Sequence, residues 1–377
     1  MDTMIKEPQK SRSVVELAHE LGRNFEKREV EHDLSGTFVE ENYAELKAAE
    51  LFSAMIPEEL GGLGWTFTEM CEFLRVTAHY SPSTALAFSM HQHLTGATVW
   101  KHLHGKGGAE LLERISKEQL VLISTGARDW LGSNGTMELV DGGYRLTAKK
   151  SFASGSVHGD IFVTSAPYEH PTEGKQVLHF AVPRRSEGVS IEQDWDTLGM
   201  RGTGSCSAIM ENVFVPEASI ALVRPQEGFH PIFGVVLRVA MPLIMSVYTG
   251  IAEKAAEMAI GTIKRSKHPK AWATSRVGEL NNTLLNGQVV LRDMIRNTNE
   301  FDFVPVDDSG HQVLSRKTII AKAAIDTVSQ AMHMVGGPGF YRKTRLEQLF
   351  RDVQAAHYHP LPEQDQLLFS GEFLLKE

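Results

Sequence analysis

The amino-acid sequence predicts an α+β protein of three domains: a helical domain over residues 1–118, a β-domain over 119–227 and a helical bundle over 228–377. Three observations lead to this prediction. Apolar residues recur at helical spacing in the first third, short β-rich runs fill the middle, and helical periodicity returns in the last third. The length of 377 residues agrees with two or three domains of ordinary size.

The N-terminal domain carries several signals of helical structure. Thr66 and Glu69 form a capping-box pair that opens a helix. This helix should end before Ser81-Pro82, because a residue that precedes proline disfavours helical dihedral angles. A further helix is predicted from Ser83 to Leu103. Apolar residues at helical spacing predict an earlier helix: Val14, Leu17, Ala18, Leu21 and Phe25.

Five β-rich runs characterise the middle domain. Turn signals such as Asp141-Gly142-Gly143 and Glu173-Gly174 separate them, which is typical of a sheet or a small barrel. The runs are Leu120 to Thr125, Gly143 to Thr147, Asp160 to Ser165, Val177 to Val182, and Ser207 to Val215.

The C-terminal domain is predicted to consist of long helices with one apolar face each. Such a face must be covered by another surface. We therefore expect the face between Val277 and Ile295 to pack against a partner subunit in a homo-oligomer. The two clearest faces are Val277, Leu280, Leu284, Leu291 and Ile295, and Ile320, Ala324, Thr327, Ala331 and Val335.

Composition and charge exclude several classes of protein. The net charge is −9 and the chain has no basic block, so nucleic acid is not an expected partner. The apolar stretch from Phe233 to Ala252 carries Arg238 and Pro242, which indicates a buried helix and no membrane insertion. Cys71 and Cys206 form no disulfide framework and the first residues resemble no signal peptide, so we expect a cytoplasmic protein.

The sequence lacks the motifs of several common catalytic classes. It contains no GxGxxG after a strand, no GxxxxGK[ST], no HExxH and no GxSxG. No metal site is predicted either. His91 and His93 are two positions apart and would point in different directions on a helix, while His102 and His104 bring no carboxylate with them.

Several short segments follow one another in a fixed order. They are PEELGGLG at 57–64, LGMRGTGS at 198–205, GGPG at 336–339 and RD at 351–352. Together they resemble the motifs of the acyl-CoA dehydrogenase superfamily of flavoproteins. The resemblance implies an N-terminal helical domain, a middle β-domain and a C-terminal four-helix bundle.

The same resemblance implies contacts between the β-domain and a flavin, expected to be FAD, with FMN as the alternative. Ser124 and Thr125 match the strand end that meets the flavin pyrimidine ring. Phe152 and Ser154 match the strand whose aromatic side chain covers one edge of the isoalloxazine and whose hydroxyl bonds toward N5. As an alternative, the hydroxyls are ordinary strand residues. Ser133 lies in the substrate loop of the family and is a candidate substrate contact.

A second group of residues is implied at the other end of the cofactor. Arg265 would reach the pyrophosphate across a subunit interface, and His333 occupies the usual glutamine position of the family. Gly336 and Gly337 would let the backbone approach the adenine half. The alternatives are a solvated cation for Arg265 and a helix C-cap for the two glycines. A cofactor site shared between subunits implies a homo-oligomer, expected to be a tetramer.

The catalytic carboxylate of the dehydrogenases is missing from both of its family positions. Eight residues after Asp352 stands Pro360, and ten residues before Gly250 stands Ala240. The dehydrogenase reaction needs a base with a raised pKa in a pocket that excludes water. Glu363 is the nearest carboxylate in the chain.

Two enzymatic readings therefore stay open. In the first, the protein dehydrogenates an acyl-CoA-type thioester with Glu363 as a relocated base and passes electrons to an electron-transfer flavoprotein. In the second, it is a monooxygenase that acts on a small organic substrate with flavin reduced by a flavin reductase. In that case His359 and either His91 or His93 serve in place of the carboxylate. The alternative for His359 is a surface residue without a catalytic role. A third, non-enzymatic reading is a scaffold that kept the fold without turnover.

Overall fold

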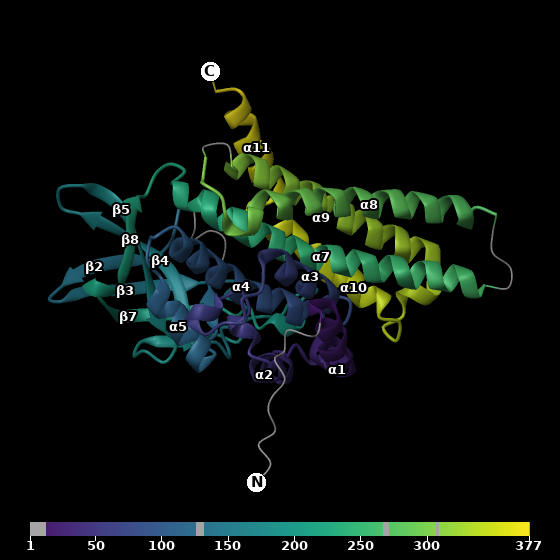
Figure 1. Ribbon diagram of the computed structural model, residues 1–377, viewed down its shortest axis with the longest axis horizontal. Helices are drawn as coiled ribbons and strands as arrows, with labels where there is room; N and C mark the ends of the chain where they lie inside the picture. Colours follow the sequence, from purple (N-terminus) through teal and green to yellow (C-terminus); the bar gives the residue numbers. More distant parts are fainter. Residues whose placement is uncertain (1–12, 126–131, 267–270, 307–308, 377) are drawn as a thin grey trace, which may run out of the picture.

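A computed structural model describes residues 13–125, 132–266, 271–306 and 309–376 (Figure 1). A β-sheet lies at one end of the molecule and long helices extend away from it, with the N-terminal helices packed along their side (Figure 1). The helices of the first segment are α1 (Val14–Ser35), α2 (Glu40–Ala48), α3 (Phe67–Thr77), α4 (Pro82–Leu103) and α5 (Ala109–Glu118).

Local signals account for the starts of these helices. The side chain of Thr66 accepts a hydrogen bond from the backbone of Glu69, whose carboxylate accepts one from the backbone of Thr66, so the predicted capping box opens α3. Ser81 caps α4, and Pro82 occupies its first turn, where a missing N–H costs nothing. The predicted helix from Ser83 to Leu103 is thus confirmed with its start moved by one residue.

The middle segment forms one mixed sheet in the order β6-β7-β3-β2-β4-β5-β8, with β1 added in parallel to β4. The sequence predicted five of its strands; β2, β6 and β8 were missed. The strands are β1 (Leu122–Ser124), β2 (Thr136–Val140), β3 (Gly143–Lys150), β4 (Ile161–His170), β5 (Gly174–Pro183), β6 (Val189–Ile191), β7 (Ala208–Pro216) and β8 (Ile220–Pro225).

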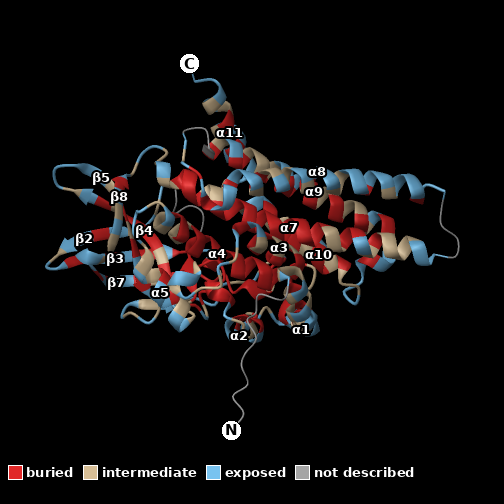
Figure 2. Cartoon of the chain, viewed as in Figure 1, coloured by how far each residue is buried: buried red, intermediate tan, exposed pale blue. Residues whose placement is uncertain are grey.

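The C-terminal segment is a bundle around one central helix, α7 (Pro231–Arg265). Its neighbours include α3, α4, α8 and α9, and its buried surface forms much of the core (Figure 2). The apolar window of α7 is long enough to cross a membrane, but 83% of it is buried inside the protein, which agrees with a core helix. The other helices are α8 (Ala273–Thr298), α9 (Ser309–Val335), α10 (Leu346–Val353) and α11 (Glu363–Leu374).

One expectation about α8 was wrong. Leu280 and Leu291 are buried against the chain's own bundle, and Val277, Leu284 and Ile295 pack partly buried against the same core. The apolar face that we expected to need a partner subunit is therefore covered within the chain by α7 and α9. The domain boundaries after residues 118 and 227 fall between α5 and β1 and between β8 and α7, and they stay a prediction.

Candidate active site

Two polar side chains meet beside the C-terminal end of β1, and a third lies close enough to act on one of them electrostatically. The hydroxyl of Ser124, the last residue of β1, lies 3.3 Å from Nε2 of His93 on α4. His93 in turn acts electrostatically on His359, in the segment between α10 and α11. The structure therefore brings together three of the residues that the sequence singled out.

Both of these histidines are neutral near pH 7. Burial lowers the pKa of His93 to about 4, against an opposing effect of the Ser89 backbone. Loss of water around the ring lowers the pKa of His359 to about 3, and the positive charge of Lys317 and the nearby His93 act in the same direction. Each ring can consequently serve as both a donor and an acceptor of hydrogen bonds at neutral pH.

His359 is held by residues that sequence reasoning missed. The hydroxyl of Tyr248 on α7 lies 2.6 Å from Nε2 of His359, and the two ring centroids are 5.3 Å apart. Lys317 on α9 is buried and donates to the backbone carbonyl of Leu361, which stands two residues after His359. The sequence signals for them are a tyrosine in the middle of an apolar helix and a lysine on a buried helix.

Thr125 directly follows β1 and Ser133 lies shortly before β2, and both of these strands pair with β4. The buried hydroxyl of Thr125 donates to Thr164 on β4 at 3.0 Å. The hydroxyl of Ser133 lies 2.9 Å from that of Ser165, also on β4. Lys150, 1% exposed, donates to the carbonyl of Ser165 at 2.7 Å and thereby ties β3 to this edge of β4. Residues 126–131, which carry most of the expected substrate loop, lie outside the described residues.

Phe152 and Ser154 follow β3 in an unusual backbone conformation. Phe152 has φ +58°, a left-handed region that a bulky residue enters only at a cost. Its ring is 64% exposed and meets Trp195 edge-on at 5.9 Å. The hydroxyl of Ser154 lies 2.8 Å from that of Ser205, which lies 2.8 Å from that of Thr203. Polar and aromatic groups are thus displayed together on this turn.

His91 occupies a different environment from His93, as their spacing on a helix predicts. Its Nδ1 accepts from the backbone of Leu122 at 2.9 Å, and its Nε2 lies 2.7 Å from the carbonyl of Phe52. The ring is buried, and burial lowers its pKa to about 4. His91 therefore joins β1 to the N-terminal helices, and both of its nitrogens are already engaged.

The carboxylates near the site are placed for other roles. Glu363 is exposed at the start of α11 and acts electrostatically on Lys317. Asp352 is fully buried, and its Oδ1 accepts from the backbone of Met200 at 2.5 Å. Within the described part of the chain, no carboxylate forms a hydrogen bond or an ion pair with His93 or His359.

The second group of predicted cofactor residues lies at the other end of the bundle. Arg265 is exposed at the end of α7, and His333 is exposed in the last turn of α9. Gly336 and Gly337 follow α9 and have open space around them. The structure does not bring these residues to Thr125 and the β-domain, which lie at the opposite end of the long helices (Figure 1).

Comparisons with known proteins cover most of the chain. Residues 10–116 match the acyl-CoA dehydrogenase N-terminal domain, and residues 127–213 match its middle domain. The chain is 24% identical over 419 aligned residues to dibenzothiophene monooxygenase of Mycolicibacterium goodii, covering 100% of this chain and 97% of that protein. It is 29% identical to SfnC of Pseudomonas putida, named as an FMNH2-dependent monooxygenase, over 68% of this chain and 64% of that protein.

Relatives named as dehydrogenases match as well. YdbM of Bacillus subtilis, named as an acyl-CoA dehydrogenase, is 27% identical over 89% of this chain and 90% of its own. Among solved structures, KijD3 in complex with FMN and a dTDP-linked amino-keto sugar superposes with a TM-score of 0.87 at 22% identity, covering 97% of this chain and 94% of that one. The two matched domains, the order of the motifs and the fold show that the chain belongs to the acyl-CoA dehydrogenase superfamily.

Proposed function

We propose that this protein is a monooxygenase that uses reduced flavin to oxygenate a small organic substrate. One observation carries the proposal. Where the dehydrogenases need a carboxylate base, this chain has Ala240 and Pro360, and the site holds two neutral histidines, His93 and His359, with no carboxylate bonded to either within the described part of the chain. A neutral imidazole suits hydrogen bonding to a heteroatom or to a reacting oxygen and is a poor substitute for a carboxylate in removing an α-proton.

The residues of the β-domain fit an isoalloxazine ring. Phe152 displays a largely exposed ring two residues before Ser154, so a flat aromatic molecule on this turn would find both a packing surface and a donor. Ser124 and Thr125 add hydroxyls at the end of β1. When bound, reduced flavin supplies the electrons that activate molecular oxygen.

FMN is the flavin that we favour. Arg265 and His333 would serve the pyrophosphate and adenine half of FAD, and in one chain they lie at the end of the long helices away from the β-sheet (Figure 1). FMN lacks that half and needs none of these contacts from the same chain. The KijD3 structure contains FMN and SfnC is named as FMNH2-dependent, and both support the same choice.

This chain's own residues then have separable tasks. Phe152 would pack against the flavin ring, Ser154 would offer it a hydrogen bond, and Thr125 would hold its pyrimidine side. His93 and His359 stay neutral and offer a hydrogen bond to the substrate or to the oxygen that is transferred to it. The helices α4 and α7 exclude water from this region, because their facing residues are buried (Figure 2).

The electron source is a separate protein. The sequence has no GxGxxG motif for a nicotinamide cofactor, so reduced flavin must be delivered by a flavin reductase. Under the dehydrogenase alternative the partner is an electron-transfer flavoprotein, which removes electrons instead of supplying them. The cytoplasmic location expected from the sequence belongs to the same proposal.

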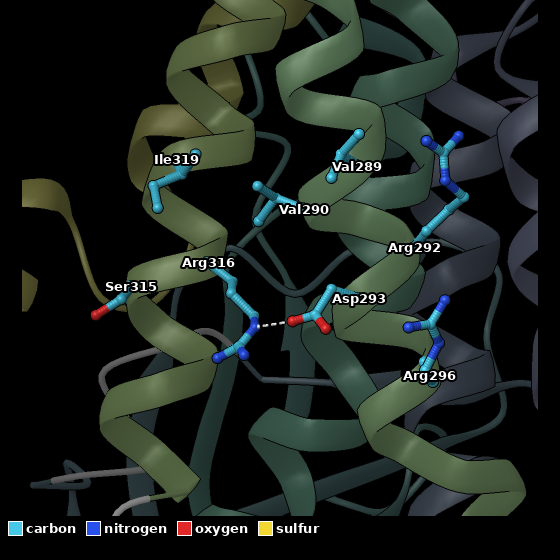
Figure 3. Close-up of a pocket in the computed structure, with 8 residues that line it drawn as sticks. All are labelled: Val289, Val290, Arg292, Asp293, Arg296, Ser315, Arg316 and Ile319. Carbon is cyan, nitrogen blue, oxygen red and sulfur yellow. Dashed lines mark hydrogen bonds and ion pairs between the residues drawn. The ribbon is translucent and has the colours of Figure 1, made fainter.

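We further propose a homotetramer assembled through the outer surface of α8 and α9. A groove runs between these helices, with Arg316 of α9 donating to Asp293 of α8 at 2.7 Å (Figure 3). Val289 and Ile319 are 49% and 44% exposed on its walls, so their aliphatic side chains are available for a contact between subunits. The groove is lined by Val289, Val290, Arg292, Asp293, Arg296, Ser315, Arg316 and Ile319.

An anaerobic reduction experiment tests the chemistry. The protein loaded with oxidised FMN, and separately with FAD, is mixed with a panel of acyl-CoA thioesters, and flavin absorbance is followed. We expect no bleaching. In a second, aerobic arm we expect oxygen consumption coupled to substrate oxidation only after a flavin reductase and NADH are added. Bleaching by a thioester without a reductase would replace the monooxygenase by the dehydrogenase. Failure to bind any flavin would favour the silent scaffold.

A further inference from the structure

A hydrogen bond between buried Tyr248 and half-buried His359 joins the central helix to the active site. Tyr248 is 0% exposed in the middle of α7, and its hydroxyl lies 2.6 Å from Nε2 of His359. The two residues are 111 positions apart in the sequence. This is the one hydrogen bond that the Tyr248 hydroxyl makes within the described part of the chain.

The direction of this bond follows from the chemistry of the two groups. Burial raises the pKa of Tyr248 well above its ordinary value, so the phenol keeps its proton. If Nε2 of His359 were the donor, the phenol hydrogen would be left buried without an acceptor, which costs more than the bond contributes. Tyr248 therefore donates, Nε2 accepts, and the ring proton of neutral His359 sits on Nδ1.

The atom that carries this proton is free to act. Nδ1 of His359 makes no hydrogen bond to any described residue and is not sealed from solvent. A molecule bound beside the ring can thus receive a hydrogen bond from Nδ1–H. With the opposite tautomer the same atom would present a lone pair.

Lys317 fixes the position of the segment that contains His359 through a second hydrogen bond. Its ammonium group is 1% exposed and donates to the carbonyl of Leu361 at 3.0 Å. Its charge also disfavours the imidazolium form of His359. The backbone on the C-terminal side of His359 is in this way anchored to α9, while its ring is anchored to α7.

We propose that Tyr248 and Lys317 are positioning residues that hold His359 as an Nδ1–H donor aimed at the bound substrate. The inference rests on the proposed function of the site and specifies how its histidine works. The groups that face His359 are Tyr248 of α7, Lys317 of α9 and His93 of α4. Asp352 of α10 acts on Tyr248, and Glu363 of α11 acts on Lys317, so each reaches His359 only through its neighbour.

The first test needs no activity. Protein labelled with ¹⁵N-histidine is examined by solid-state NMR at pH 7, and the His359 signals are assigned as those that vanish in His359→Ala. The ring nitrogen shifts of the wild type should show Nδ1 protonated and Nε2 accepting a hydrogen bond. In Tyr248→Phe the ring should populate the Nε2–H tautomer. The matched control is Tyr168→Phe, which removes a buried phenol in β4 and should leave these signals unchanged.

The second test uses turnover with reduced FMN and whichever substrate supports it. Tyr248→Phe should lower kcat about five- to tenfold, the effect of losing one neutral hydrogen bond, with little change in KM. The acidic limb of the pH profile of kcat should move to higher pH in Tyr248→Phe, because the donor that favours neutral His359 is gone. Lys317→Met should move the acidic limb in the same direction, and Lys317→Arg, which keeps the charge and a donor, should restore part of the wild-type profile.

The outcomes separate the two proposals. An Nδ1–H signal that changes in Tyr248→Phe supports the positioning role even if no oxygenation is found, in which case the proposed function fails alone. A wild-type His359 with its proton on Nε2 would overturn the positioning role whatever the activity. So would a Tyr248→Phe variant whose signals and pH profile match those of Tyr168→Phe.

Discussion

Replacing Asp352 with asparagine should raise the thermal stability of the protein at pH 8 and leave it nearly unchanged at pH 5. Asp352 is 0% exposed on α10. Burial raises the pKa of its carboxyl to about 7, and the nearby carboxylate of Glu29, also buried, acts in the same direction. Its Oδ1 accepts from the backbone of Met200, and its Oδ2 accepts from Gln348 at 3.3 Å.

The sign and size follow from the difference between the folded and unfolded states. An aspartate in an unfolded chain titrates near 3.9, about three pH units below the folded value of about 7. The folded state therefore holds the proton more tightly. The free energy that protonated Asp352 contributes to stability is fully present below about pH 4. It is lost as the pH rises through 7, and the loss is about 4 kcal/mol. Asparagine carries no charge at any of these pH values and avoids this loss.

The substitution has a cost of its own. An asparagine Oδ1 can still accept from Met200, but its amide nitrogen cannot accept from Gln348, which removes about 1 kcal/mol. The net gain at pH 8 is then about 3 kcal/mol. With an unfolding entropy of about 2.1 cal/mol/K per residue, a chain of 377 residues melts about 4 °C higher for that gain. At pH 5 the gain and the cost nearly cancel.

Thermal melts followed by circular dichroism at pH 5 and pH 8 provide the measurement. Asp141→Asn is the control, because Asp141 is exposed in the turn between β2 and β3 and its replacement should shift both melts equally. A variant of Asp352 that melts below the wild type at pH 8 would refute the reasoning. A difference that is the same at the two pH values would refute it equally, since the burial of charge would then not be its cause.

Three further predictions concern the site. Ser154→Ala should raise the dissociation constant of the flavin about fivefold, the effect of one lost hydrogen bond, as measured by quenching of flavin fluorescence; an unchanged constant would remove Ser154 from the cofactor site. His359→Ala should cut oxygenation about a hundredfold, while Glu363→Gln stays near the wild type; the reverse ranking would restore the dehydrogenase reading. His91→Ala should destabilise the fold by about 2–4 kcal/mol in denaturant titrations, because two backbone groups lose their partner, and turnover per folded molecule should not change; a selective loss of turnover would contradict its structural role.

Periodicity predicted the elements well and their partners poorly. The 3.6-residue period placed α4 to within one residue, because burial against any surface imposes that pattern. The same pattern on α8 could not tell whether the covering surface belongs to this chain or to another, and we assigned it to the wrong one. β6 was missed because three residues are too few to show alternation.

Site residues could be predicted where the residue type itself indicates a chemical role. They could not be predicted where the role depends on a partner residue that lies on a distant element. His93 and His359 were identified from the family motifs and are near each other in the fold. Tyr248 and Lys317 come from helices whose sequences read as ordinary core, and only the packing of α7 and α9 brings them to the segment after α10. The local sequence around each residue does not indicate that Tyr248 and Lys317 contact this segment.

The geometry of the long helices links the choice of flavin to the state of assembly. A helix of 35 residues is about 50 Å long, and α7 begins beside the β-domain, where Arg224 of β8 stacks over Phe233, and ends at Arg265. A flavin dinucleotide held at the start of α7 could not reach Arg265 of the same chain over that span. If the cofactor is FAD, the adenine half must therefore be held by a second chain, and binding depends on assembly. If the cofactor is FMN, residues at the β-domain end are enough to bind it, and the exposed glycines after α9 need not contact the cofactor.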